Sequence, residues 1–385
     1  MSGDKLAFDA RVAQAQGSGV ASYSRSLIEH LHLLPERFKL AFLVEDSRPW
    51  DQIAFPGTAE LLRTKVGRSD WLRRDVWEQF VLPRCLERSG VALYHGLDYG
   101  APIRAGRFLR VVTFYDALAF SPIDDRHPVV KARIRFLIRQ VARSVDAIVT
   151  ISDYSRQELL RHLDVAPERI VTVWCGISET FFGRCRPDEA DSVIRKLRFD
   201  DPFILYYGGF GKRKNVEALV RAFARVRKVE DCRLVLAGPG DGAFAGLGAL
   251  IRALGLEQVV TRFGFASEEE LRALLALCRL FVFPSLYEGF GLPIAEAMAC
   301  GAPVLSSRAG ALAEIAGEGA LLVDAKEPAT LAEAMLSALG DAVLLESLRV
   351  RGRERAQQFR WRHGVERLGK LYCSLVDGRR AGCPG

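Results

Sequence analysis

The sequence predicts an α/β protein built from doubly wound parallel sheets. Short runs of apolar residues, of the kind buried in parallel sheets, alternate with helical segments along most of the chain. Several of these runs end in glycine-containing loops, which let the backbone approach a ligand closely. The length of 385 residues suits two domains, each large enough for its own hydrophobic core.

In the first half of the chain, the first predicted strand is followed by a glycine loop and a helix. The loop spans 16–20 and the helix 21–32, with Leu27, Ile28 and Leu31 at helical spacing. This order can cradle a phosphate, although G-x-G by itself is also typical of a tight turn. The predicted strands of this half are 5–10, 38–44, 91–95, 109–114, 147–152 and 171–176.

The second half opens with a strand that leads into a basic turn. The strand covers 202–209 and ends in two glycines, and Lys212, Arg213 and Lys214 follow it. Cations beside flexible glycines suit a pyrophosphate, while a basic cluster alone is also typical of a solvated turn. The strands predicted after it are 233–238, 260–265, 280–283, 302–307 and 320–323, and the helices are 216–226, 293–300, 328–339 and one reaching about residue 375.

The most informative stretch is 280–310, which predicts a strand, a glycine-bearing loop, a helix and a second strand. Pro293 suits the first turn of the helix and Gly301 its C-terminal cap. The free N–H groups at the start of this helix favour an anion such as a phosphate. Glu288 in the loop and Glu296 one turn into the helix can both accept hydrogen bonds from sugar hydroxyls. Taken as a lone pair, these glutamates could equally be solvated surface residues.

The string E-G-F-G-L-P-I-A-E, with seven residues between its glutamates, resembles the signature of retaining nucleotide-sugar glycosyltransferases of family four. The resemblance implies that Glu288 contacts a hydroxyl of the donor sugar and that Glu296 holds the ribose. It also implies that backbone amides between them face the sugar and the phosphates. Those amides belong to Phe290, Gly291 and Leu292.

The basic turn also matches the family pattern in part. The family grips the donor phosphates with a basic pair, and Lys214 matches its lysine. The family's upstream arginine falls on Gly209 here, so Arg213 is the candidate substitute. These residues would stabilise the departing nucleotide diphosphate.

The first half resembles the start of the same family, where the loop containing Gly19 borders the donor phosphates and the acceptor. The family often has a histidine before the aspartate of V-V-T-F-Y-D-A-L, where this chain has Tyr115 followed by Asp116. Asp116 remains a candidate for positioning the sugar or the acceptor. His95, just after a strand, is either functional or packed against neighbouring loops.

The resemblance implies a GT-B architecture, in which two Rossmann-like domains face a cleft. We predict an acceptor domain at 1–185, a donor domain at 186–360, and a helix at 361–385 that returns towards the first domain. The chain contains no Asp-x-Asp, so a metal that clamps the diphosphate has no obvious ligands. We therefore expect no metal and no cofactor beyond the nucleotide-sugar co-substrate.

The composition limits the predicted cellular location of the protein and the classes of partner that it could bind. No apolar run is long enough for a membrane span, and the N-terminus lacks the apolar core of a signal peptide, so the predicted location is cytoplasmic. The net charge of +7 suits an anionic partner, but no nucleic-acid-binding motif accompanies it. The acid-free stretch 131–143 predicts either a basic helix lying peripherally on an anionic membrane, at the inner face of the cell membrane, or a core-packed helix with a solvated face. The mixed basic and apolar stretch 62–74 leaves the same alternatives open.

The predicted function is a metal-independent, retaining transfer of a hexose from a nucleotide sugar to a saccharide or lipid-linked saccharide. The resemblance favours mannose from GDP-mannose, because many relatives with this opening and loop build surface polysaccharides. UDP-glucose, UDP-N-acetylglucosamine and dTDP-sugars stay open as donors. The alternatives are a GT-B nucleotide-sugar epimerase and a catalytically silent scaffold that binds a nucleotide sugar.

Overall fold

The computed structural model describes residues 3–15, 19–48, 53–57, 59–67, 71–104 and 106–381. The chain forms two compact units, one of Met1–Gly176 with Trp361–Gly385 and one of Ile177–Arg360. The boundary therefore lies at Gly176 rather than at residue 185. The segment after it belongs to the second unit because η5 (Glu179–Phe182) packs on helices α9 and α10, and Arg272 Nη1 donates to the Thr180 carbonyl at 2.9 Å.

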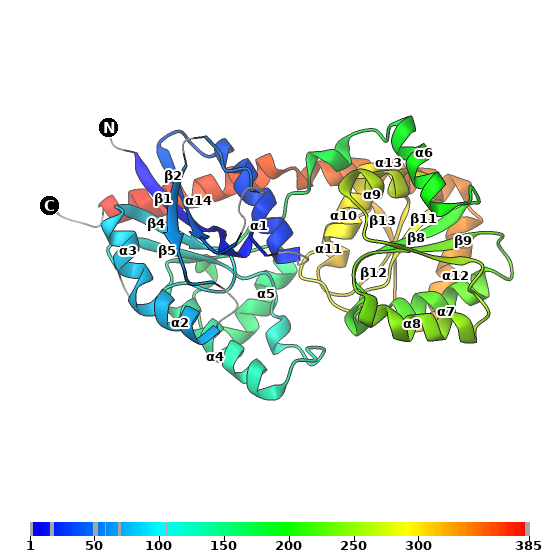
Figure 1. Ribbon diagram of the computed structural model, residues 1–385, viewed down its shortest axis with the longest axis horizontal. Helices are drawn as coiled ribbons and strands as arrows, with labels where there is room; N and C mark the ends of the chain where they lie inside the picture. Colours follow the sequence, from blue (N-terminus) through cyan, green and yellow to red (C-terminus); the bar gives the residue numbers. More distant parts are fainter. Residues whose placement is uncertain are drawn as a thin grey trace. The chain divides into compact units, whose positions relative to one another are not determined.

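The first unit contains a seven-stranded, all-parallel sheet with the order β3-β2-β1-β4-β5-β6-β7. Helices cover both faces: α3, α4 and α5 pack on one face, and α1 and α14 on the other (Figure 1). The strands are β1 (Asp4–Asp9), β2 (Phe38–Glu45), β3 (Glu60–Thr64), β4 (Val91–Gly96), β5 (Leu109–Thr113), β6 (Ala147–Thr150) and β7 (Ile170–Thr172). The helices are α1 (Gly19–His30), α2 (Trp71–Phe80), α3 (Leu82–Arg88), α4 (Pro128–Ser144), α5 (Asp153–His162) and α14 (Trp361–Ala381), with short 3-10 turns η1 (Ala10–Val12), η2 (Leu31–Leu33), η3 (Leu118–Phe120) and η4 (Pro167–Arg169).

The second unit contains a six-stranded, all-parallel sheet with the order β10-β9-β8-β11-β12-β13. Helices α7, α8 and α12 cover one face, and α6, α9, α10 and α13 the other (Figure 1). Its strands are β8 (Phe203–Tyr207), β9 (Arg233–Ala237), β10 (Val260–Gly264), β11 (Leu280–Phe283), β12 (Val304–Ser307) and β13 (Ala320–Val323). Its helices are α6 (Pro187–Leu197), α7 (Val216–Val226), α8 (Asp241–Ala253), α9 (Glu268–Leu277), α10 (Leu292–Cys300), α11 (Leu312–Ala316), α12 (Pro328–Leu339) and α13 (Ala342–Ala356), with 3-10 turns η6 (Lys212–Lys214) and η7 (Gln357–Phe359).

The predicted strands are confirmed to within a few residues, whereas edge strand β3 and several helices were not predicted. Strand β3 lies at the sheet edge, where two of its five positions are exposed, so it lacks the apolar run that marked the others. Helix α6, which is rich in charged residues, was not predicted. Its sequence nevertheless has Pro187 in the first turn and Glu189 three residues after the cap, which are helix-start signals. Helices α8 and α13 were not anticipated.

The last helix, α14, packs within the first unit, as the resemblance implied. Gly176 allows this return, because a Cβ there would lie 2.3 Å from the ring of Trp361. Further along the helix, the Tyr372 hydroxyl lies 2.6 Å from His95 Nδ1, and Thr113 Oγ1 lies 2.9 Å from His95 Nε2. Burial lowers the pKa of His95 to about 3, so its imidazole is neutral. The packed-histidine alternative for His95 is therefore the correct one.

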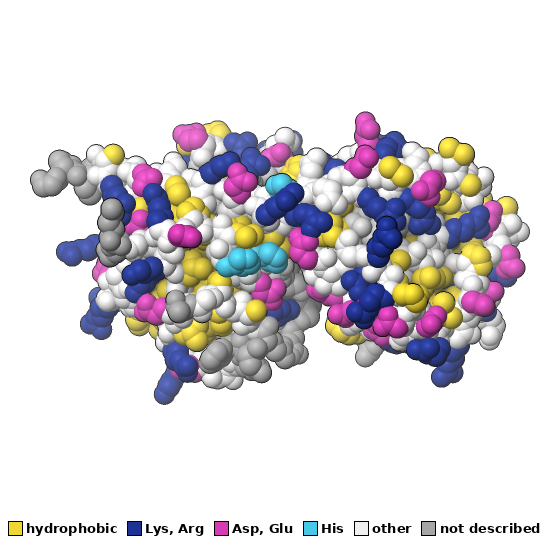
Figure 2. Space-filling view, turned by 90° about the horizontal axis from the view of Figure 1, so that it is seen from above, with side chains coloured by type: hydrophobic (Ala, Val, Ile, Leu, Met, Phe, Trp, Pro, Cys, Tyr) yellow, Lys and Arg dark blue, Asp and Glu magenta, His cyan; other side chains and the backbone are white. Residues whose placement is uncertain are grey.

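The surface shown in Figure 2 carries cationic and anionic side chains intermixed over both units. Across the described ranges, no single helix has the length and apolar character to cross a membrane; α12 and the stretch Ala342–Phe359 meet that test only as a pair, bent by 94°.

Candidate functional site

The carboxyl ends of β8 and β11 carry the residues that the sequence singled out. The order of the second sheet reverses between these two strands, and ligands of doubly wound folds bind at such a switch point. The basic turn η6 follows β8, and the loop with Glu288 follows β11. Two segments that lie more than 70 residues apart in the chain therefore meet at one sheet edge.

Glu288 is the centre of an ion-pair cluster. Lys214 Nζ lies 2.5 Å from its Oε1, Arg213 Nη1 lies 2.8 Å from its Oε2, and Ser285 Oγ donates to Oε1 at 2.7 Å. Glu288 is only 8% exposed. The two cations predicted to hold a diphosphate are thus bound to the glutamate predicted to contact the sugar.

The pKa values in this cluster follow from burial and charge. Burial opposes ionisation of Glu288, but the charges of Lys214 and Arg213 outweigh it, so the pKa of this carboxyl lies below its ordinary value. The pKa of Lys214 is lowered, because burial and the charge of Arg213 outweigh the attraction of Glu288. The carboxylate is therefore ionised at neutral pH and acts as counter-ion to both basic groups.

Backbone contacts hold the two loops together. Leu286 N donates to the Arg213 carbonyl at 2.8 Å, and Ser285 Oγ lies 3.2 Å from the same oxygen. Asn215 is the residue before α7, as predicted, but its side chain does not cap that helix. Its amide donates instead to the carbonyls of Pro284 and Ala325, at 3.3 and 2.8 Å. It therefore ties the basic turn to its neighbouring loops.

Two glycines have backbone conformations that the Glu288 loop requires. Gly310 has φ +63°, and a Cβ there would lie 2.4 Å from the Glu288 carbonyl oxygen. Gly291 has φ +108° and precedes α10, where a Cβ would lie 2.5 Å from Leu312. Residues with a side chain rarely adopt such φ values, so both positions depend on glycine.

Helix α10 begins at Leu292 and is capped at its C-terminal end by Gly301 in the left-handed conformation, as predicted. The Phe290 side chain is buried, with its ring centroid 5.5 Å from that of Phe359. Leu292 is half-buried. Phe290 therefore serves the core through its side chain, and only its backbone is placed to face a ligand.

Glu296 lies in a different electrostatic environment from Glu288. It is half-buried, its Oε2 has no hydrogen-bond partner among the described residues, and burial together with the charge of Glu268 raises its pKa to about 8. The pKa of Tyr207, at the end of β8, is raised mainly by Glu296. A buried carboxyl oxygen without a partner is ready to bind a hydroxyl of a ligand.

Glycines also open the end of β8. Gly208 has φ +149°, and Gly238 approaches it so closely that a Cβ on Gly238 would lie 2.0 Å from the Gly208 carbonyl oxygen. Nothing lies within 4 Å of a Cβ on Gly209, whose carbonyl accepts from the Tyr206 hydroxyl at 2.5 Å. The backbone at Gly209 is therefore accessible beside the basic turn.

The remaining candidates, Gly19 and Asp116, belong to the first unit. Gly19 is the first residue of α1 and is exposed, with open space around it, whereas Gly17 and Ser18 lie outside the described residues. Asp116 follows β5, and its Oδ1 accepts from Leu118 N at 2.9 Å and lies 3.1 Å from the Tyr99 hydroxyl. Tyr115 donates its hydroxyl to the Leu97 carbonyl at 2.5 Å. Asp116 is thus held in a fixed orientation, and Tyr115 is anchored to the main chain.

Sequence reasoning missed two residues of these sites. Ser285, directly after β11, binds Glu288 and the basic turn at once, and its position at a strand end was the available signal. Tyr99 positions Asp116, and its φ of +49° is rare for a residue with a side chain. No sequence pattern marked Tyr99.

Within the described part of the chain, no group of three His, Cys, Asp or Glu residues is arranged to hold a metal ion.

Comparisons with known proteins match both units. Residues 188–359 match the model of "Glycosyl transferases group 1", and residues 17–181 match "Glycosyltransferase Family 4". The chain is 34% identical over 275 residues to O-antigen chain mannosyltransferase B of Escherichia coli, covering 70% of this chain and 71% of that protein. It is 31% identical over 221 residues to the serotype-specific mannosyltransferase WbdA of Escherichia coli, covering 56% of this chain and 27% of that longer protein.

Among solved structures, sucrose-phosphate synthase from Thermosynechococcus elongatus superposes with a TM-score of 0.78 at 23% identity, covering 97% of this chain and 100% of that one. This likeness, together with the two all-parallel sheets, shows the GT-B fold. The chain belongs to the glycosyltransferases of group 1 and family 4, and it is a transferase of glycosyl groups.

Proposed function

We propose that the chain transfers a mannosyl group from GDP-mannose to a hydroxyl of a saccharide or lipid-linked saccharide, with retention of configuration and without a metal. The mannosyltransferases among its relatives support the sugar. Because the named relatives are transferases, the epimerase and scaffold alternatives are not favoured.

The observation that supports the proposal most directly is the cluster of Lys214, Arg213 and Glu288 at the switch point of the second sheet. In the proposed reaction, the bond from the anomeric carbon to the diphosphate breaks and a bond to the acceptor oxygen forms. The proton of the acceptor hydroxyl leaves with the diphosphate. Lys214 and Arg213 would neutralise the charge that develops on that leaving group, which is the role of preorganised cations in such a step.

The same cluster suggests how the Glu288 carboxylate and the donor diphosphate would share Lys214 and Arg213. The Glu288 carboxylate is bound to both cations, so a diphosphate that contacts them would compete with it. When a diphosphate arrives, the cations gain a second anionic partner, and Glu288 becomes available to a hydroxyl of the transferred sugar. Glu296, with its unpartnered oxygen, would accept from a ribose hydroxyl.

The test is a thermal-shift and turnover screen of the purified protein with a chelator present. The ligands are GDP-mannose, UDP-glucose, UDP-N-acetylglucosamine and dTDP-glucose, with their free diphosphates. A ligand that binds the folded state raises the melting temperature, so we expect a shift with GDP and GDP-mannose and release of GDP on adding a mannoside acceptor. A thermal shift confined to another nucleotide would overturn the assignment of GDP-mannose as donor. Turnover only after magnesium is restored would overturn the metal-independent mechanism. The anomeric configuration of the product is read by NMR.

We also propose that the first unit contacts an anionic membrane through α4. This helix contains no acidic residue, and Val129, Val130 and Phe136 are 70%, 44% and 60% exposed. Apolar side chains among cations are typical of helices that lie at a membrane surface. Co-sedimentation with anionic vesicles, but not with neutral ones, is expected, and Phe136→Ser should reduce it. The cytoplasmic location stays a prediction.

A further inference from the structure

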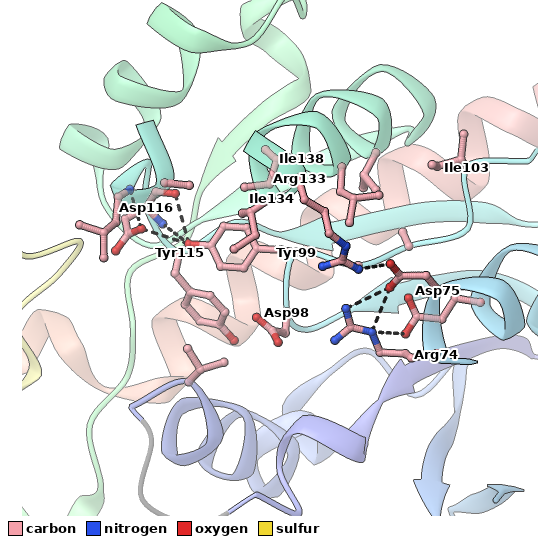
Figure 3. Close-up of a pocket in the computed structure, with 18 of the residues that line it drawn as sticks. Arg74, Asp75, Asp98, Tyr99, Ile103, Tyr115, Asp116, Arg133, Ile134 and Ile138 are labelled. Carbon is pink, nitrogen blue, oxygen red and sulfur yellow. Dashed lines mark hydrogen bonds and ion pairs between the residues drawn. The ribbon is translucent and has the colours of Figure 1, made fainter. Parts of the chain in front are cut away.

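The first unit contains a cavity of about 440 Å³ that none of the donor-site residues lines. It lies at the carboxyl ends of β4 and β5, between the loops that follow these strands and helices α2 and α4 (Figure 3). The order of the first sheet reverses between β1 and β4. Position and volume are therefore those of a small-molecule site in a doubly wound unit.

One end of the cavity is polar and holds Asp116. Asp98, Tyr99 and Asp116 line this end, and Figure 3 shows Asp98 between the tyrosines and the arginines on the other side. Carboxylates and a phenol beside open space are groups that accept hydrogen bonds from sugar hydroxyls. The strained backbone of Tyr99, with φ +49°, is typical of residues that a functional site holds in place.

The charged residues at the opposite end neutralise one another. Asp75 is bound by Arg133 and lies 3.1 Å from Arg74, and Arg74 also lies 3.9 Å from Glu78. Glu78 in turn lies 2.7 Å from Arg11, which is fully buried. Arg11 is also paired with Asp9. The three guanidinium groups are therefore matched by three carboxylates, and this end has no excess positive charge with which to hold a phosphate.

The wall formed by α4 is apolar. Figure 3 shows Ile134 and Ile138 above the polar residues, and Ile103 closes the wall on the α2 side. The remaining aliphatic side chains of the lining are Val20, Ala101, Leu118, Ala119, Leu137 and Val141. Sugar hydroxyls cannot form hydrogen bonds with such a wall. A hydrocarbon group that covers the wall is removed from water, and this burial of apolar surface favours binding.

The same two helices carry apolar side chains on their outer surfaces. On α2, Val76 and Phe80 are 52% and 49% exposed, and α4 exposes Val129, Val130 and Phe136. The two helices that line the cavity therefore also present apolar side chains to solvent.

We infer that this cavity binds an acceptor that joins a saccharide to an apolar group, with the saccharide at Asp116 and the apolar group against Ile134 and Leu137. The inference rests on the proposed transferase function and narrows its acceptor to a glycolipid. A purely polar oligosaccharide would leave the α4 wall uncovered.

The test compares octyl α-D-mannopyranoside with methyl α-D-mannopyranoside, each below any micelle-forming concentration and without vesicles, by titration calorimetry on the full chain. We expect the octyl glycoside to bind at least tenfold more tightly. Ile134→Ser and Leu137→Ser should each reduce this preference to less than threefold. Phe136→Ser, on the exposed face of the same helix, should preserve it, and Asp116→Asn should weaken both glycosides equally.

Equal affinity for the two glycosides, or no binding of either, would overturn the inference. So would a preference that survives in both Ile134→Ser and Leu137→Ser. An unchanged melting temperature and unchanged nucleotide binding show that these variants are folded. The donor reaction is measured separately as GDP release from GDP-mannose: failure there with an intact octyl preference refutes the proposed function alone, and the converse refutes the glycolipid acceptor alone.

Discussion

Replacing Glu288 by glutamine is the most informative perturbation of the donor site. The change keeps the shape of the side chain and removes its charge, so Lys214 and Arg213 lose their shared counter-ion. We expect the ligand-free protein to be destabilised. We also expect GDP to bind the variant more tightly than it binds the wild type, because the diphosphate no longer competes with a carboxylate.

The magnitude follows from the burial of the cluster. Removing one partner of a buried ion pair costs about 3–5 kcal/mol. The Glu288 and Lys214 side chains are 11% and 17% exposed but Arg213 is 32% exposed, so we take the lower end of that range, about 3 kcal/mol. If bound diphosphate restores all but about 1 kcal/mol, the remaining 2 kcal/mol or so corresponds to GDP binding roughly 30-fold tighter.

The assay is chemical denaturation with and without saturating GDP, together with titration calorimetry. Glu189→Gln is the matched control, because Glu189 is a buried carboxylate of the same unit that pairs with Arg186 and Arg272. The control should lose similar stability in both conditions and keep its GDP affinity. If Glu288→Gln is equally destabilised with and without GDP, or binds GDP more weakly, the two cations are not the diphosphate site.

Three further predictions concern the same unit. Lys214→Met should weaken GDP binding about 30-fold, since a charge-assisted hydrogen bond contributes roughly 2 kcal/mol, while the exposed Lys212→Met should change it less than threefold by calorimetry. The pKa of about 8 for Glu296 lies above its ordinary 4.5, so the ligand-free protein should lose stability as pH rises through that interval; a denaturation series in which Glu296→Gln keeps the same slope would contradict this. Gly310→Ala should lower turnover more than tenfold in a GDP-release assay with the fold intact, because its Cβ would displace the Glu288 carbonyl; wild-type turnover would count against it.

Local patterns were enough to predict much of the fold. Strand β11 and helices α7 and α12 have the predicted bounds, because a buried run, a proline in the first turn or a helical period each constrain only neighbouring residues. Helix α9 likewise starts at a local signal, because Ser267 and Glu270 form a capping box. Edge strand β3 and the charged helix α6 were not predicted because their composition resembles that of loops.

The sequence by itself determined which residues gather at the carboxyl ends of the strands: the E-x7-E loop, the basic turn and the glycines at 208, 209 and 291. Only the tertiary structure decided that Glu288 neutralises Lys214 and Arg213, that Glu296 has a raised pKa, and that α2 and α4 enclose a cavity with one apolar wall. The physical reason is distance along the chain. Backbone conformation is set by adjacent residues, whereas burial, charge pairing and cavities arise where crossover connections bring remote segments together.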